Sequence, residues 1–310
     1  MIEVRQPGTR LTIQDAGRPG YRDLGIPGSG AADKLSFALA NSLVGNPWDS
    51  PALECVLGGQ HFKFHDTHMV GIAGAEMWAQ VNGQNVENFT AFKVSSGDVL
   101  TFSFARTGCR AYLAVAGGIK GDPFLGSVST YLPAQLGGFK GRSLQARDEL
   151  EIGENFGAPR KIAKPYFPVI SNHIILRALE GPEFYDLSLS SQRHLFIDPY
   201  EATQNTNRMG ARLKGNRVVP DVEKHMTSSP LLPGTLQCPH DGQPILALTD
   251  GHCTGGYLRA LQVIRSDLWL LGQIKPGSQI SFRRAIESAP SEILRKRNAW
   301  YGNLMDGFTF

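Results

Sequence analysis

Hydrophobic and polar positions alternate over short distances in this chain, a pattern that predicts β-strands. In residues 61–65, HFKFH, Phe62 and Phe64 fall on one side of the chain and polar residues fall on the other. Residues 98–104, DVLTFSF, alternate in a similar way. Residues 111–116, AYLAVA, are almost continuously apolar, which is typical of a strand buried on both faces. The first half of the chain is therefore expected to be rich in short strands.

One helix is predicted near the start of the chain. Ser29 or Gly30 is its candidate cap, Asp33 lies in its first turn, and it ends at residues 45–47, Gly-Asn-Pro. Its apolar face consists of Leu35, Ala38, Leu39 and Leu43. Further along, Asn82-Gly83 predicts a tight hairpin turn, because both residue types tolerate positive φ.

A change in composition divides the chain into two parts. Residues 154–171 are rich in proline and basic residues, so we place a domain boundary there. We expect an N-terminal domain over residues 1–160, a C-terminal domain over 165–285 and a helical tail over 286–310. A short helix is also expected over residues 186–196. The predicted fold class is mostly β with few short helices, which is typical of barrels or sandwiches.

The composition is that of a folded, water-soluble protein. Of 310 residues, 41% are hydrophobic and 19% are charged, and a net charge of +3 is too small to indicate nucleic-acid binding. No uncharged apolar stretch reaches about 18 residues, so no membrane span is expected. The opening MIEVRQPGTR has no apolar signal region. The four cysteines, which include no C-x-x-C pair, predict reduced thiols in a cytoplasmic protein: Cys55, Cys109, Cys238 and Cys253.

Several motifs that bind common cofactors do not occur in the sequence. There is no G-x-x-x-x-G-K-[ST] phosphate loop, no G-x-S-x-G nucleophile motif and no A-M-K-M-like biotin attachment site. His61, His65 and His68 lie close together, but strand alternation already explains two of them as a solvated face. We therefore expect no metal site in this chain, and we expect any biotin to be carried by another protein.

The first of three polar stretches covers residues 12–33, TIQDAGRPGYRDLGIPGSGAAD. It contains Gln14, Asp15 and Arg18 among several glycines. Long polar loops of this kind are commonly functional. A turn-rich connection fixed by an Asp15–Arg18 pair is an equally open interpretation.

The second stretch, residues 203–210, TQNTNRMG, concentrates amide, hydroxyl and guanidinium groups. Arg208 has the planar fork that binds a carboxylate bidentately, and Asn205 and Asn207 can donate to a carbonyl oxygen. The alternative is a capped loop whose arginine pairs with a carboxylate in the core.

The third stretch, residues 230–257, places polar residues around the apolar strand Ile245–Leu248. Backbone N–H groups of the turn Thr254-Gly255-Gly256 can approach a ligand closely and hold an oxyanion. His240 or His252 is a candidate general base, although loop histidines are more often simply solvated. The polar residues of this stretch are Gln237, His240, Asp241, Gln243, Asp250, His252 and Thr254.

These stretches resemble the C subunit of the ATP-dependent 5-oxoprolinase group, also called allophanate hydrolase subunit 2 or the biotin-dependent carboxyltransferase A/B domain. Five motifs occur in the family's order and cover nearly the whole chain to about Phe282. They are TIQDAGRPGYRDLGIPGSGAAD, YLAVAGGI at 112–119, LGSVSTY at 125–131, NRMGARLKG at 207–215 and LPGTLQCPHDGQPILALTDGHCTGGY at 232–257.

The resemblance implies two related β-barrel domains of the cyclophilin-like kind. It implies a heteromeric complex with a smaller B subunit, and with an A subunit in the oxoprolinase system, in which ATP is used to open 5-oxoproline to glutamate. The chain alone is expected to be inactive. Other relatives transfer a carboxyl group from carboxybiotin to urea, and others antagonise an inhibitor of a sporulation kinase. The expected substrate is a small amide, lactam or urea-like compound.

The chain departs from the family's D-x-Q-T-T-G-G-Y-P motif at three positions, His252, Cys253 and Leu258. Histidine donates a hydrogen bond as glutamine does, but it also titrates near neutral pH. The departures therefore suggest a substrate different from that of the typical member.

An unreactive amide needs its carbonyl oxygen polarised and a proton moved to or from nitrogen. We expect Arg208 to polarise the substrate and Asp250 or His252 to handle the proton. A second expectation concerns Gln14, Asp15 and Arg18, which would line a subunit interface or another wall of the site. The residues expected to bind the substrate in the second and third stretches are Asn207, Gln243, Thr254, Gly255, Gly256 and Tyr257.

Overall fold

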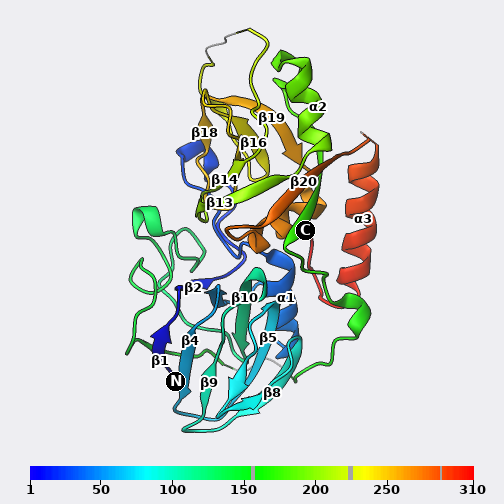
Figure 1. The fold of residues 1–310 in the computed structure, drawn as a ribbon. Helices are drawn as coiled ribbons and strands as arrows, with labels where there is room; N and C mark the ends of the chain where they lie inside the picture. The colour runs from blue at the N-terminus through cyan, green and yellow to red at the C-terminus, as the bar shows by residue number, and fades with distance from the viewer. Residues whose placement is uncertain (155–157, 223–225, 287) are drawn as a thin grey trace. The chain divides into compact units, whose positions relative to one another are not determined.

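The computed structural model describes residues 1–154, 158–222, 226–286 and 288–310 (Figure 1). The chain forms two compact units. The N-terminal unit consists of residues 1–18, 29–170 and 298–309, and the C-terminal unit consists of residues 19–28, 171–297 and Phe310. Part of the first polar stretch thus belongs to the C-terminal unit.

The N-terminal unit contains two main sheets. In its described residues a six-stranded sheet has the order β11-β1-β4-β9-β6-β7, and a five-stranded sheet has the order β2-β3-β10-β5-β8. The strands of the first sheet are β1 (Ile2–Pro7), β4 (Gln60–Phe64), β6 (Gln80–Val81), β7 (Gln84–Asn85), β9 (Val99–Thr101) and β11 (Glu149–Leu150). Those of the second are β2 (Arg10–Gln14), β3 (Ala52–Val56), β5 (His68–Glu76), β8 (Thr90–Val94) and β10 (Thr107–Val115).

The strand predictions for this unit are confirmed with one correction. Phe62 and Phe64 on β4 are fully buried, and β10 is buried along nearly its whole length. Asn82 and Gly83 form the expected turn between β6 and β7, with φ of 51° and 82°. The strand expected over residues 98–104 is shorter, because β9 ends at Thr101 and Phe104 is 73% exposed.

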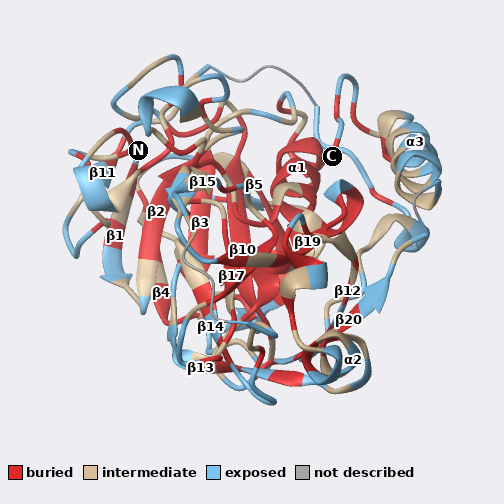
Figure 2. Cartoon of the chain, turned by 90° about the horizontal axis from the view of Figure 1, so that it is seen from above, coloured by how far each residue is buried: buried red, intermediate tan, exposed pale blue. Residues whose placement is uncertain are grey.

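Helix α1 (Lys34–Leu43) is present, but its N-terminal cap is Asp33 rather than Ser29 or Gly30. Those two residues have positive φ values of 51° and 84°, outside the extended conformation that N-cap residues adopt. The Asp33 carboxylate accepts hydrogen bonds from Ser36 N at 2.9 Å and Ser36 Oγ at 2.6 Å. Residues 35–43 are all buried, so α1 is buried on nearly every side rather than on one face (Figure 2).

A buried polar network joins α1 to the second sheet of the N-terminal unit. Glu54 on β3 lies opposite Tyr112 on β10 and accepts a hydrogen bond from its hydroxyl at 2.8 Å. Glu54 also accepts from Arg110 Nε at 3.2 Å and from Ala32 N at 3.0 Å. Burial, together with Glu54, raises the pKa of Tyr112 well above its usual value, so this hydroxyl remains a donor. The network holds the polar loop before α1 against the sheet.

The C-terminal unit is built around a closed barrel with the order β12-β19-β16-β17-β14-β13-β20 in its described residues. Parallel pairing of β12 with β20 closes the barrel. A small ribbon of β15 (Ser229–Pro230) and β18 (Thr254–Gly255) lies outside it. The barrel strands are β12 (His173–Glu180), β13 (Tyr200–Thr206), β14 (Gly210–Lys214), β16 (Thr235–Cys238), β17 (Ile245–Ala247), β19 (Leu258–Val263) and β20 (Gln279–Arg284). The predicted mostly β fold is therefore confirmed.

Helices are few, as expected. The short helix expected over 186–196 is α2 (Leu189–Ile197), and the tail forms α3 (Ala289–Gly302), which Figure 2 colours mostly as intermediate and exposed. No helix in the described residues is long and apolar enough to cross a membrane. The 3₁₀ helices are η1 (Arg22–Leu24), η2 (Leu132–Ala134), η3 (Lys164–Tyr166), η4 (Phe184–Asp186) and η5 (Arg265–Gln273).

The barrel strands alternate between a buried core face and an outer face. Ala211 on β14, Leu246 on β17 and Leu236 on β16 lie opposite one another in register and are fully buried in the core. Side chains alternate along a strand, so the residues adjacent in sequence to these three point to the outer face. They are Arg212, Ile245 and Gln237, which also lie opposite one another and form a second row. The candidate site is built on this row.

Candidate functional site

A cavity of about 270 Å³ lies on the outer face of β14, β17 and β16 in the C-terminal unit. Its floor is the row Arg212–Ile245–Gln237 together with the neighbouring pair Gly210 and Ala247. Gly210 and Ala247 are small, so the floor is low beside the longer side chains of the row. The remaining walls come from loops, through Asn205, Asn207, Met209, Leu231, His252 and Tyr257.

Asn207 is held in a fixed orientation at the edge of this cavity. Its Oδ1 accepts hydrogen bonds from Met209 N at 2.7 Å and Gly210 N at 3.3 Å. This is the usual way in which an asparagine caps a turn. With the oxygen committed to the backbone, the amide nitrogen is the end of the side chain that can donate to a ligand.

Arg208 and Asp250 do not line the cavity but pair with each other beneath its loops. The guanidinium donates to the Asp250 carboxylate through Nε at 2.7 Å and Nη2 at 3.0 Å. The two side chains are only 4% and 2% exposed. Backbone bonds from Asp250 N to Arg208 O and from Leu248 N to Met209 O join the same two segments. The pair therefore fixes the Asn207 turn beside the His252 loop.

The other residues expected from the C-terminal stretches fall into two groups. His252 and Tyr257 line the cavity with Asn207, and the Tyr257 ring contacts the His240 ring edge-on with centroids 6.0 Å apart. Gln243 lies elsewhere and exchanges hydrogen bonds with the backbone of Gly215 at 3.2 and 3.4 Å.

The Thr254-Gly255-Gly256 turn is organised by the small ribbon rather than by the cavity wall. Thr254 and Gly255 form β18 and pair with Pro230 and Ser229. A Cβ atom added at Gly255 would lie 2.5 Å from Gln237 Nε2, so this glycine leaves the space that the Gln237 amide occupies.

Of the three departures from the family motif, only His252 lines the cavity. Leu258 begins β19 and belongs to the hydrophobic core of the barrel, which explains an apolar residue there. Cys253 is partly exposed and a free thiol. The change with direct consequences for a ligand is therefore the histidine.

Arg22, from the first polar stretch, holds two cavity loops together. Its Nη2 donates to the backbone carbonyl of Leu231, and to that of His252 at 3.2 Å. Arg22 lies in residues 19–28, which belong to the C-terminal unit. A side chain distant in sequence thus positions both walls of the cavity.

We expect Arg22→Ala to lower the free energy of unfolding by about 1–3 kcal/mol, because it removes charged hydrogen bonds to two carbonyl groups. Urea denaturation followed by circular dichroism measures this change. Arg193→Ala, at an exposed position of α2, is the matched control and should change stability by less than about 0.5 kcal/mol. Equal stability of the two variants would refute the positioning role of Arg22.

Gln14, Asp15 and Arg18 lie in the N-terminal unit, where they organise the segment 124–130. Asp15 Oδ1 accepts from Ser127 Oγ at 2.6 Å and Ser129 Oγ at 2.5 Å, and Oδ2 accepts from Val128 N at 2.7 Å. Arg18 is 1% exposed and donates to the carbonyls of Phe124 and Ser129, while Gln14 donates to Thr130 O. These contacts connect two of the motifs that carry the family resemblance.

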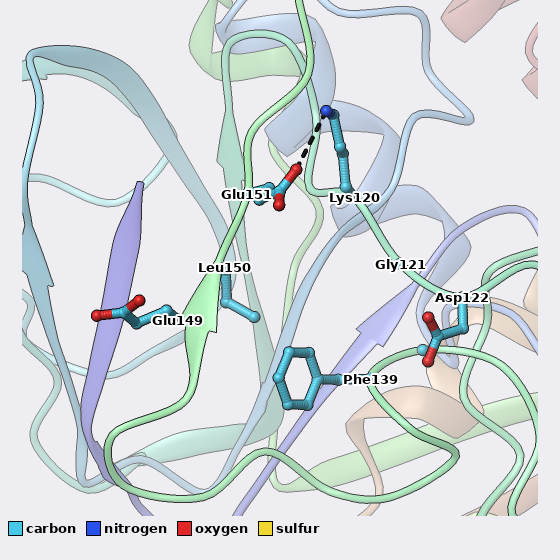
Figure 3. Close-up of a pocket in the computed structure, with 8 residues that line it drawn as sticks. Lys120, Gly121, Asp122, Phe139, Glu149, Leu150 and Glu151 are labelled. Atoms are coloured by element: carbon cyan, nitrogen blue, oxygen red, sulfur yellow. Dashed lines mark hydrogen bonds and ion pairs between the residues drawn. The ribbon is translucent and has the colours of Figure 1, made fainter.

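A second surface cavity, of about 250 Å³, lies in the N-terminal unit (Figure 3). It is lined by Lys120, Asp122, Glu149 and Glu151 around Phe139 and Leu150. Lys120 is paired with Glu151 at 3.2 Å, and both side chains are well exposed. This cavity lacks the convergent amide donors of the barrel cavity, so it is a poorer site for a small carbonyl compound.

The described residues contain no group of three or more His, Cys, Asp or Glu side chains placed to hold a metal ion. Burial raises the pKa of the Cys238 thiol to about 12, so this neighbour of Gln237 stays protonated and inert at neutral pH.

The cysteines should differ strongly in their reaction with iodoacetamide. Cys253 is partly exposed, whereas Cys55, Cys109 and Cys238 are buried. Burial also raises the pKa of Cys55, which lowers its thiolate fraction further. Mass spectrometry of the native protein should show alkylation at Cys253 first and at the others only after unfolding. Equal labelling of Cys238 and Cys253 in the native state would contradict the structure.

With this geometry established, the class of protein follows from comparison with known sequences. The chain belongs to the family described as the carboxyltransferase domain, subdomain A and B, which it matches over residues 24–284. The matched region contains the barrel cavity and both loops that Arg208 and Asp250 connect.

Within this family, the chain is similar to several individual proteins. The chain is 36% identical over 297 residues to the C subunit of 5-oxoprolinase from Escherichia coli (strain K12), a match that covers 96% of this chain and 94% of that protein. It is 34% identical to the C subunit of 5-oxoprolinase from Haemophilus influenzae, covering 97% and 96% of the two chains. The crystal structure of Kluyveromyces lactis urea carboxylase superimposes with a TM-score of 0.92 at 29% identity, over 99% of this chain and 29% of that one.

Two polar residues of the cavity floor, Arg212 and Gln237, are not among the site residues expected from the sequence. Arg212 lies in the NRMGARLKG motif and Gln237 in the third polar stretch. The alternation of side chains along β14 could have identified Arg212, because Ala211 and Leu213 face the core and Arg212 between them must face outward.

Proposed function

We propose that this chain is a subunit of an ATP-dependent 5-oxoprolinase complex that hydrolyses 5-oxoproline to glutamate. The observation that carries the proposal is the 36% identity to the C subunit of a 5-oxoprolinase over almost the full length of both chains. We infer that the chain works with a B subunit and an A subunit, that ATP is used by the complex, and that the chain is inactive alone. Its free cysteines agree with a cytoplasmic location.

The barrel cavity supports this proposal chemically. Opening a lactam requires donors fixed where negative charge develops on the carbonyl oxygen, together with a group that moves a proton. Asn207 supplies a preoriented amide, and His252 supplies an imidazole in the same cavity. Tyr257 adds a phenol at the same wall, which makes a small polar compound a suitable ligand.

Arg208 and Asp250 enter the proposal as positioning residues. Their mutual pairing and burial leave them suited to hold the Asn207 and His252 loops rather than to contact substrate. His252 then becomes the residue proposed to handle the proton. Gly255 contributes through its close contact with the Gln237 amide, whereas Gln243, which is bonded to the Gly215 backbone, has no part in the proposed site.

The test is ATP-dependent turnover of 5-oxoproline by the reconstituted subunits, with and without this chain. We expect glutamate to form only when this chain is included. We also expect His252→Ala to lower kcat by about 10²–10⁴-fold, the usual contribution of an acid–base residue. Glutamate formation at the same rate without this chain would refute the proposed function.

A second candidate is the carboxyltransferase half of a biotin-dependent urea-type carboxylase. It is favoured by the TM-score of 0.92 with a urea carboxylase over 99% of this chain. In that case carboxybiotin would be supplied by another protein. Transfer of labelled carboxyl from free carboxybiotin to urea by the assembled complex, with no turnover of 5-oxoproline, would select this alternative.

A further inference from the structure

We propose that Arg212 and Gln237 select the substrate class of the barrel cavity: a small amide that also carries a carboxylate. In this arrangement Gln237 Nε2 donates to the amide carbonyl, and the Arg212 guanidinium binds the carboxylate. The inference rests on the proposed function, because it names the substrate class of the same cavity. It separates carboxylated lactams and carbamoyl compounds from urea itself, which is neutral.

Gln237 is the strongest single indication of a ligand. Its side chain is 7% exposed and lines the cavity, yet its Nε2 has no hydrogen-bond partner among the described residues. A buried donor without an acceptor is costly, and such groups are rare in native proteins unless something else binds them. A ligand oxygen in the cavity would provide the missing acceptor.

Gly255 packs directly against the Gln237 amide. A Cβ atom at this position would lie 2.5 Å from Gln237 Nε2, closer than any normal contact allows. Any side chain larger than glycine would therefore displace the amide. The glycine at this position of β18 thus leaves room for the Gln237 amide in its present orientation.

Arg212 gives the cavity its charge. It is exposed on the outer face of β14, and no described residue forms an ion pair or hydrogen bond with its side chain. No Asp or Glu occurs among the described residues that line this cavity. A planar guanidinium in a cavity without a competing carboxylate is suited to bind a ligand carboxylate bidentately.

The sheet register places the two groups on either side of Ile245. Arg212 and Gln237 are both opposite Ile245, on the strands that flank β17. Adjacent strands are about 4.8 Å apart, so the two Cα atoms are separated by about 10 Å. Two long side chains over this span suit a compact molecule whose carbonyl and carboxylate are separated by a few bonds. 5-Oxoproline has this form.

The experiment measures binding to the full chain, alone and with its partner subunit, using calorimetry and matched pairs of ligands. One pair is 5-oxoproline and 2-pyrrolidinone, which lacks the carboxylate. The other is N-carbamoylglycine and N-methylurea. We expect the carboxylated member of each pair to bind at least about tenfold more tightly, as a charge-assisted bidentate contact provides.

The variants distinguish the two groups. Arg212→Gln should remove the preference within each pair by weakening only the carboxylated member about tenfold. Gln237→Met and Gly255→Ala should weaken both members about equally, by roughly fivefold to tenfold, since both disturb the carbonyl donor. Lys214→Gln removes an exposed cation two residues along the same strand, outside the cavity lining, and should change neither.

Three results would overturn the inference: equal binding within each pair, an unchanged preference in Arg212→Gln, or no saturable binding of any carboxylated ligand. Its failure is distinguishable from failure of the proposed function. If the complex does not turn over 5-oxoproline but N-carbamoylglycine shows the Arg212-dependent preference, the proposed reaction is wrong and the substrate class stands. If 5-oxoproline is turned over but the preference is absent, the proposed reaction stands and the inferred substrate class is wrong.

Discussion

Arg208→Ala is expected to lower the free energy of unfolding by about 3–5 kcal/mol, because it leaves the Asp250 charge buried without its partner. The Asp250 side chain is only 2% exposed, and the pair is bidentate, with bonds of 2.7 and 3.0 Å. Because the same pair holds the Asn207 turn beside the His252 loop, ligand affinity should fall as well. Urea denaturation and calorimetry on the folded fraction measure the two effects.

The double substitution Arg208→Met with Asp250→Leu distinguishes the stability cost of an unpaired buried charge from the effect of the pair on the orientation of the two loops. Replacing both buried charges by apolar side chains should recover most of the lost stability. Binding should remain weak, since the bonds that orient the two loops are not restored. Lys214→Ala, at an exposed position, is the control for loss of a cation and should change stability by less than about 0.5 kcal/mol. A loss below about 1 kcal/mol in Arg208→Ala would contradict this account.

Glu54→Ala is the second substitution with a large expected effect, about 3–5 kcal/mol of unfolding free energy. Its carboxylate is fully buried and accepts hydrogen bonds from Arg110, Tyr112 and Ala32, so its removal leaves three donors without that acceptor. Arg110 is 4% exposed, and its charge would lose its buried counterion. The loss should be concentrated in the N-terminal unit.

Hydrogen exchange followed by mass spectrometry locates this loss. Peptides from β3 and β10 should exchange faster in Glu54→Ala, while peptides from β14 and β17 keep their protection. Glu149→Ala, at an exposed position, is the matched control. Unchanged protection in β3 and β10 would show that the buried network does not stabilise the N-terminal unit.

Much of the fold could be predicted from local patterns. The alternation at Phe62 and Phe64 and the apolar run of β10 depend only on neighbouring residues, and both were confirmed. The cap of α1 was assigned to the wrong residue because glycine and serine are common at helix starts. Their positive φ values arise from the turn that leads into the helix, which composition does not reveal.

The site was less predictable because burial and long-range pairing decide its chemistry. Arg208 and Asp250 were selected for their chemical type, but their 42-residue separation hides that they pair with each other. The structure agrees with the alternative interpretation of Arg208, because its guanidinium pairs with the buried carboxylate of Asp250. Gln237 is one of the polar residues of the third stretch, but the sequence does not reveal its burial, which involves residues distant in the chain such as Gly255.

The central claim is that the outer face of β14, β17 and β16 binds a small carbonyl compound. Methyl NMR spectroscopy of the full chain during titration with 5-oxoproline tests this most directly, because Ile245 and Ala247 lie on the cavity floor while Leu246 between them faces the core. The account predicts saturable shifts at Ile245 and Ala247 that exceed those at Leu246. Saturable shifts confined to the N-terminal unit, with Ile245 and Ala247 unchanged, would contradict it.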